Sequence, residues 1–219
     1  SINRENPMLV IHTGNVIQGG SGSMGVGPGD IARQFRKFLE QKKRLAPILH
    51  VIAGTRDIYD GSLDLFRRYA GDKLYYSFNY GTVHFIILNI MDGDSQMDPE
   101  QIKWLTDDLA RHRSDGAIFV FTHHPVLAPP YSGMRCLDAG RLHELFVNHS
   151  VTAVFSGSAR RLYDFTKDGI RYITAGCGGY NLEDRDWGAV QYYIVRYDGA
   201  ALSIRPARVN VTAGACTIR

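Results

Sequence analysis

The chain has 219 residues, of which 44% are apolar and 11% aromatic, enough for one domain with a sizeable core over residues 1–219. Its formal net charge of +3 is too small to indicate a nucleic acid or an acidic membrane as partner. The chain lacks a run of ~18 apolar residues and a signal-peptide pattern, so we expect a soluble protein. The compartment stays open, with an intracellular one favoured and an organelle such as the mitochondrion allowed.

Seven apolar runs rich in β-branched and aromatic residues predict strands, several of them buried on both faces. They cover residues 8–13, 48–53, 83–90, 117–122, 151–155, 171–174 and 189–196. Helical patterns lie between them, one over residues 30–45, one beginning at Asp98-Pro99 and one near Asp138. Strands dominate after residue 170, which predicts a layered α/β domain ending in antiparallel pairs.

Glycine accounts for six of the eleven residues from 19 to 29, and this composition predicts a flexible loop rather than regular structure. Gly20, Gly22 and Gly25 fit the pattern GxGxxG, which is found where dinucleotides bind. That fingerprint needs its glycines at a helix N-terminus, whereas the predicted helix begins only near Asp30. We therefore give the dinucleotide interpretation little weight.

The three cysteines, Cys136, Cys177 and Cys216, are odd in number and form no CxxC pair. Structural zinc sites need such closely spaced ligands, so we expect buried free thiols.

Four polar clusters follow predicted strands directly, with the sequences IHTGN (11–15), VIAGTRD (51–57), FVFTHHP (119–125) and VFSGSAR (154–160). Loops at the carboxyl ends of strands in open α/β sheets converge and form ligand sites. We therefore expect these four clusters to meet.

In order and spacing, the four clusters resemble the motifs of the calcineurin-like, or purple-acid-phosphatase-like, metallophosphoesterases. Those motifs are Gly-Asp, Gly-Asn-His-Asp/Glu, a strand ending in His, and Gly-His-x-His. Residues 74–89 and 101–105 also resemble stretches common in that family. The resemblance implies a four-layer α/β/β/α sandwich of two mixed sheets flanked by helices. The family's opening Asp-x-His motif has no counterpart in this sequence, which leaves two alternatives open: the strand that carries it lies outside the sequence given, or it was lost.

The resemblance also implies a site for two divalent metals, Fe, Mn or Zn, which lower the pKa of bound water from about 15.7 to about 7. This chain departs from the ligand pattern at most positions. Asn15 stands in place of the bridging aspartate, Thr55 and Arg56 in place of Asn-His before Asp57, and Ser158 and Arg160 in place of two histidines. His123 alone keeps a ligand type, and His124 is expected to lie behind it. We expect no catalytic residue and no bound metal, with His123 and Asn15 as residual metal candidates.

The substituted arginines allow two interpretations. The first is a plug in which Arg56 and Arg160 fill the former metal pocket and pair with Asp57. In the second, Arg56, Arg160 and Arg161 bind a phosphate or phosphorylated ligand without hydrolysing it.

The substitutions favour an inactive metallophosphoesterase-like domain that acts as a structural or interaction subunit, with other protein subunits as partners. One alternative is a phosphoric ester hydrolase with residual single-metal activity. Another is a module that binds RNA or an acidic partner through the basic helix over residues 30–45. The remaining histidines are scattered, and we expect them to be structural.

Overall fold

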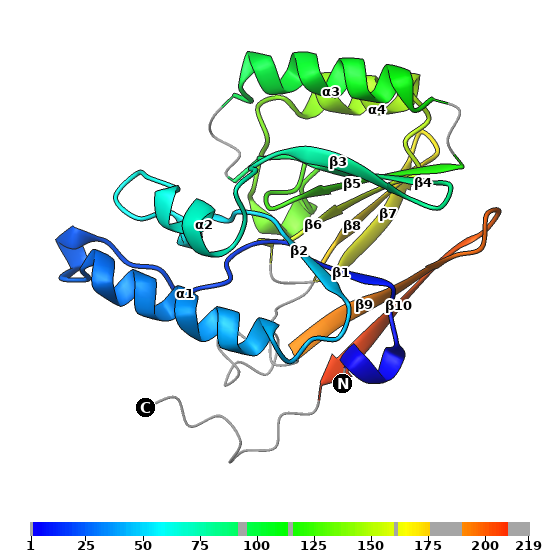
Figure 1. The fold of residues 1–219 in the computed structure, drawn as a ribbon. Coiled ribbons are helices and arrows are strands. Elements are labelled where there is room, and N and C mark those ends of the chain that lie inside the picture. Colours follow the sequence, from blue (N-terminus) through cyan, green and yellow to red (C-terminus); the bar gives the residue numbers. More distant parts are fainter. Residues whose placement is uncertain (1, 92–95, 114–115, 160–161, 176–189, 210–219) are drawn as a thin grey trace.

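The computed structural model describes residues 2–91, 96–113, 116–159, 162–175 and 190–209 (Figure 1). Its centre is a six-stranded mixed sheet in the order β3-β4-β5-β6-β8-β7. The four inner strands run parallel, and each edge strand pairs antiparallel with its neighbour. The strands are β3 (Tyr76–Tyr80), β4 (Val83–Ile87), β5 (Ala117–Thr122), β6 (Ala153–Ser156), β7 (Tyr163–Lys167) and β8 (Ile170–Thr174).

One face of this sheet is covered by α3 (Pro99–Arg111) and α4 (Ala139–Asn148). Leu105 and Leu109 of α3 and Phe146 of α4 are fully buried in the same cluster as Ile86 and Val120 of the sheet. The start of α3 is the predicted one, because the Asp98 side chain caps it by accepting from the backbone N–H of Glu100. Every residue of β5 is buried, as expected for a strand covered on both faces.

The other face packs against a second layer made of two strand pairs (Figure 1). Here β1 (Leu9–His12) pairs parallel with β2 (Ile48–Val51), and β9 (Val190–Tyr197) pairs antiparallel with β10 (Leu202–Val209). Side chains of Ile52, Phe119 and Phe155 form the core between the two layers. The predicted second mixed sheet is thus two separate two-stranded sheets within the described residues.

The outermost layer consists of α1 (Pro28–Lys42) and α2 (Asp64–Tyr69). Ile31 and Phe35 of α1 are fully buried with Phe66 of α2 against Val51 of β2 and Ala53 of the following loop. The order of layers is therefore helix, sheet, strand pairs, helix, and the predicted four-layer sandwich is confirmed.

The glycine-rich segment contains more regular structure than its composition predicts. A 3-10 turn, η2, spans Gly22–Met24, and α1 begins at Pro28 rather than Asp30 because proline is well suited to the first helical position. The backbone of Gly19 exchanges two hydrogen bonds with the Gln34 side chain, at 3.0 and 3.1 Å. Gly25 still lies three residues before α1, so the GxGxxG glycines do not form its N-terminus.

Three further 3-10 turns are η1 (Ile2–Glu5), η3 (Thr55–Asp57) and η4 (Pro130–Ser132). Cys136 is a half-buried free thiol, and Cys177 and Cys216 lie outside the described residues. In the part of the chain that the structure describes, every helix is too short or too polar to cross a bilayer.

Candidate functional site

The four polar clusters meet where β1, β2, β5 and β6 end. The backbone N–H of Gly157 donates to the carbonyl of His123 at 3.0 Å. A Cβ atom added to Gly14 would lie 2.6 Å from Nδ1 of His123, and one added to Gly54 would lie 2.8 Å from its Cε1. These close approaches require glycine. They place the first two loops against the imidazole of His123, and the Gly157 bond places the fourth loop against its backbone.

Asp57 joins the first two of these loops. Its fully buried carboxylate accepts backbone N–H groups from Asn15 and Gly54 on Oδ2, both at 2.9 Å, and from Ile17 on Oδ1 at 3.3 Å. Burial raises the pKa of Asp57 to about 6, although these donors favour the charged form. Both oxygens are engaged in holding loops, so Asp57 acts as a structural acceptor.

Arg56 does not form the predicted ion pair with Asp57, because the backbone already surrounds that carboxylate. The guanidinium Nη1 instead donates to the carbonyl of Gln18 at 3.0 Å, toward the glycine-rich loop. The same loop approaches the arginine backbone, since a Cβ atom on Gly19 would lie 2.5 Å from the Arg56 carbonyl oxygen. Arg160 and Arg161, the other arginines of both predicted arrangements, lie outside the described residues.

Asn15 is the residue expected at the position of the bridging aspartate. It has a left-handed backbone, with φ of 58°, which asparagine tolerates better than most residues. Its side-chain Oδ1 accepts the backbone N–H of Arg56 at 2.8 Å. The side chain that would bridge metals therefore ties the first loop to the second.

His123 is 1% exposed and has one engaged and one unengaged nitrogen. Nδ1 donates to the carbonyl of Thr13 at 2.6 Å, whereas the buried Nε2 has no hydrogen-bond partner among the residues that the structure describes. Burial lowers the pKa of His123, which favours the neutral ring with a lone pair on Nε2. Its neighbour His124 bonds through Nε2 to the carbonyl of Arg135 at 2.9 Å, and its place behind His123 stays a prediction.

The remaining candidate positions add little to a metal site. Thr55 is exposed, and Ser158 is half-buried with φ of 63°. Two adjacent divalent cations need anionic oxygen ligands between them, and the described residues offer only Asp57, whose oxygens already accept three N–H groups. The described donor set does not fit a di-metal centre.

A second cluster, missed by the sequence analysis, joins β4 to α3. His84 Nε2 lies 2.8 Å from Asp108 Oδ2, and Ser77 and Arg111 each donate to Asp108 Oδ1 at 3.0 Å. His112 Nδ1 bonds to the backbone carbonyl of Asp108, also at 2.8 Å. The four-residue separation of Asp108 and His112 is the signal that could have revealed it.

Among the described residues, this cluster brings three possible metal ligands together, His84, Asp108 and His112. The two imidazoles are stacked, with ring centroids 3.6 Å apart and 11° between their planes. An imidazole lone pair lies in the plane of its ring, so two parallel rings one above the other cannot both direct it at one ion. The cluster is a hydrogen-bonded tie between sheet and helix.

Comparisons with known proteins place the chain among phosphoesterases by sequence. A family model described as calcineurin-like phosphoesterase matches residues 1–157. Purple acid phosphatase 23 of Arabidopsis thaliana is 34% identical over 130 residues, covering 53% of this chain and 28% of that protein. Purple acid phosphatase 13 of the same plant is 36% identical over 121 residues, covering 48% and 22%. The chain thus spans about a quarter of the length of these relatives.

Solved structures share the fold at low sequence identity. A dimetal phosphatase from Danio rerio superposes with a TM-score of 0.62 at 15% identity, covering 79% of this chain and 73% of that one. GAP50, the anchor in the inner membrane complex of Plasmodium, gives 0.60 at 18% identity, covering 80% and 63%.

Proposed function

Because the chain belongs to the calcineurin-like phosphoesterases, we propose that it is a member without di-metal catalysis, serving as a structural or interaction subunit of a larger assembly. One observation carries the proposal: Asn15, which stands where the family has its bridging aspartate, and Asp57, the retained acidic residue of the second motif, both bond to backbone N–H groups of the loops. Asn15 Oδ1 accepts from Arg56, and the Asp57 carboxylate accepts from Asn15, Ile17 and Gly54. One protein with this fold, GAP50, is described as an anchor, so the fold is compatible with a role other than hydrolysis.

The proposal is tested by metal content and hydrolysis. The protein is expressed and purified in the presence of Mn, Fe and Zn, and its metal content is measured by mass spectrometry. Hydrolysis is assayed with p-nitrophenyl phosphate and bis(p-nitrophenyl) phosphate as substrates. We expect substoichiometric metal and identical background rates in the wild type and in His123→Ala. His149→Ala serves as the matched control, because His149 lies at the end of α4, outside the four loops.

A second candidate function is phosphoric ester hydrolysis with a single divalent ion at His123. The unpartnered, buried Nε2 favours it, since the Thr13 carbonyl holds the tautomer that a metal ligand needs. Stoichiometric metal and an activity that is lost in His123→Ala but kept in His149→Ala would establish this candidate and overturn the first.

A gain-of-function variant gives a complementary test. The triple substitution Asn15→Asp, Thr55→Asn and Arg56→His restores three family ligand types in the two loops that Asp57 joins. We expect it to bind more divalent metal than the wild type, because it adds a carboxylate and an imidazole to the donor set.

A further inference from the structure

The two edges of the six-stranded sheet differ in composition (Figure 1). The edge strand β7 carries Asp164 and Lys167, and Asp164 forms an ion pair with Arg171 at 2.6 Å. The edge strand β3 reads Tyr-Ser-Phe-Asn-Tyr and contains neither a charged residue nor a proline. Charged side chains and prolines are the usual means of keeping an edge strand from pairing with another chain. The β3 edge lacks both.

The turn after β3 determines which backbone groups point to its free side. Gly81 and Thr82 form a two-residue turn between Tyr80 and Val83, which pair with each other, and φ of Gly81 is 59°. Such turns close on a pair that exchanges both hydrogen bonds, and along the ladder these pairs alternate with pairs that exchange none. Tyr80 therefore bonds to β4, as does every second residue before it.

The other residues of β3, Ser77 and Asn79, direct their backbone N–H and C=O away from β4. Within the described part of the chain these backbone groups form no hydrogen bond. The two side chains are engaged toward α3, that of Ser77 with Asp108 and that of Asn79 with His84. A further strand laid along β3 would pair the free backbone groups.

The sequence of β3 is close to a palindrome about Phe78. When a second copy lies antiparallel to it with Phe78 on the two-fold axis, Ser77 of each copy faces Asn79 of the other. These two residues carry the outward N–H and C=O groups, so they exchange both hydrogen bonds in this register. Tyr76 then faces Tyr80 of the other copy, and aromatic cross-strand pairs are favourable.

Charge does not oppose this pairing. Residues 74–82, which are centred on Phe78, contain no charged side chain. A two-fold axis at Phe78 therefore places no like charges of the two strands opposite each other, an arrangement that would destabilise the pair.

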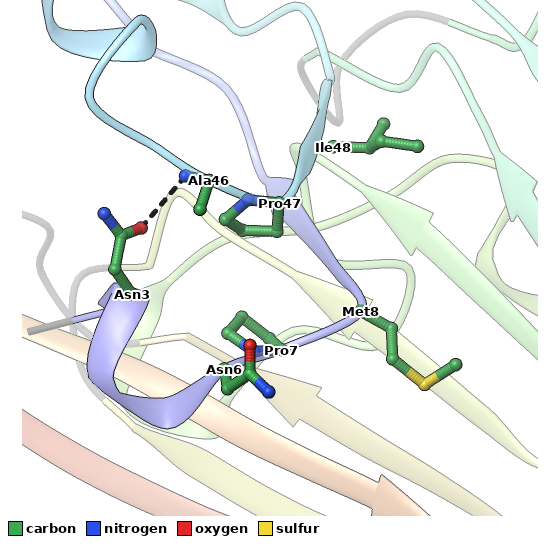
Figure 2. A pocket seen from close by; sticks show the side chains of 7 residues that line it. All are labelled: Asn3, Asn6, Pro7, Met8, Ala46, Pro47 and Ile48. Atoms are coloured by element: carbon green, nitrogen blue, oxygen red, sulfur yellow. Dashed lines mark hydrogen bonds between the residues drawn. The ribbon is translucent and has the colours of Figure 1, made fainter.

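Partly exposed aromatic and apolar side chains lie beside the free edge. Tyr80 is 43% exposed, and the half-buried Phe78 stacks on His50 of β2 with ring centroids 4.1 Å apart. Ile48, two residues before His50, points to the same side of β2 and is 66% exposed (Figure 2). Apolar side chains exposed next to an unpaired edge are typical of a protein-binding surface.

We propose that two copies of this chain associate by antiparallel pairing of β3 with β3, which joins their six-stranded sheets into one. The association is closed, because each copy uses its β3 edge and the charged β7 edge opposes further growth. A five-residue strand is about 17 Å long, so the contact is smaller than a standard interface and the dimer is reversible. The inference rests on the proposed interaction role and names one partner for it, at a surface outside the four loops.

Sedimentation velocity from micromolar to millimolar protein concentration measures the association. We expect a concentration-dependent dimer in the wild type and at least about tenfold weaker association in Tyr80→Lys, because lysine on an edge strand opposes pairing. Met24→Lys is the matched control, since Met24 is 74% exposed in η2 and should leave the association unchanged. Circular dichroism checks that both variants fold.

Amide hydrogen exchange read by NMR tests the register. The amides of Ser77 and Asn79 should become protected as the wild type dimerises, and they should stay unprotected in Tyr80→Lys. Oxidation of Phe78→Cys should cross-link two copies, because directly opposite Cα atoms in this kind of pair lie ~4.5 Å apart. Tyr80→Cys should not cross-link, because its opposite residue is Tyr76.

Several outcomes would overturn the inference. These are a wild type that is monomeric at millimolar concentration, a dimer that Tyr80→Lys leaves intact, and a dimer in which the Ser77 and Asn79 amides exchange freely. A monomeric wild type in which peptides selected from a phage-displayed library protect these two amides would assign the edge to a strand of another protein. Stoichiometric metal in the same preparation would contradict the proposed inactivity and leave the dimer result unaffected.

Discussion

Replacing Asp57 removes the group that joins the first two motif loops. Asp57→Ala leaves three N–H groups without their acceptor, the buried ones of Ile17 and Gly54 and the partly buried one of Asn15. Each unsatisfied buried donor costs about 1–3 kcal/mol, and partial relaxation of the loops reduces the sum, so we expect a loss of about 4 kcal/mol in the free energy of unfolding. Asp57→Asn keeps one oxygen but turns an amide NH₂ toward a backbone N–H, and we expect a smaller loss of about 1–3 kcal/mol at neutral pH.

The pH dependence of the same substitution has a definite sign. Burial raises the pKa of Asp57 from 3.8 to about 6, so between these values the folded state retains a proton that the unfolded state has released. This carboxyl therefore favours folding increasingly as the pH falls through 6, and the gain is lost as the pH rises again. At a pH of about 4.5 the gain amounts to about 2 kcal/mol, and Asp57→Asn lacks it.

The measurement is urea unfolding followed by circular dichroism at several pH values between about 4.5 and 7.5. The difference in unfolding free energy between the wild type and Asp57→Asn should widen by about 2 kcal/mol toward the acidic end. Asp107→Asn is the control, because the side chain of Asp107 is exposed on α3 and, among the described residues, pairs with Lys103 alone. A difference that stays constant with pH, or an Asp57→Ala variant as stable as the wild type, would refute the reasoning.

Two further substitutions test the close contacts described above. Gly14→Ala should lower the free energy of unfolding in urea by more than about 2 kcal/mol, because φ is 96° and the added Cβ would lie 2.6 Å from His123 Nδ1. Gly25→Ala should lower it by about 1 kcal/mol, because φ is 73° but the added Cβ would meet no atom within 4 Å. Equal losses would show that the backbone strain of a positive φ, rather than the contact of the added Cβ with His123, dominates. Asp108→Ala should lower the free energy of unfolding by about 3 kcal/mol, because it removes the buried acceptor between β4 and α3. The control Asp107→Ala should lower it by less than about 0.5 kcal/mol.

The elements predicted from sequence are those whose pattern is strong in a local window. The Asp98-Pro99 start of α3 combines a cap with a residue suited to the first turn, and β5 is an uninterrupted apolar run. The sequence analysis missed α2, β3, β7 and β10 as elements. Short length and polar composition explain the misses: β7 reads Tyr-Asp-Phe-Thr-Lys at a sheet edge, and β10 contains Pro206, which a central strand would not tolerate.

The site was predictable in position but not in detail. The convergence of the loops could be predicted because glycines follow several predicted strands, and parallel strands place their carboxyl ends at the same edge of a sheet. The direction of Arg56 depends on a long-range competition, because three backbone N–H groups from two loops already occupy the Asp57 carboxylate. The predicted ion pair between Arg56 and Asp57 was based on their adjacency and did not consider these donors. Two of the donors, Asn15 and Ile17, lie about 40 residues away in the chain, so the sequence around Asp57 does not reveal them.

The same competition explains how four loops can remain together without metal ions. Adjacent cations would hold such loops by binding a ligand from each, and loops deprived of them need other links. Here Asn15 links to Arg56, Asp57 links to three backbone groups, and His123 links to Thr13 on one side and Gly157 on the other. Each link uses a neutral or buried group that binds backbone, so folding of these loops should be insensitive to chelators, and any chelator-dependent loss of stability would point to an ion on His123 Nε2.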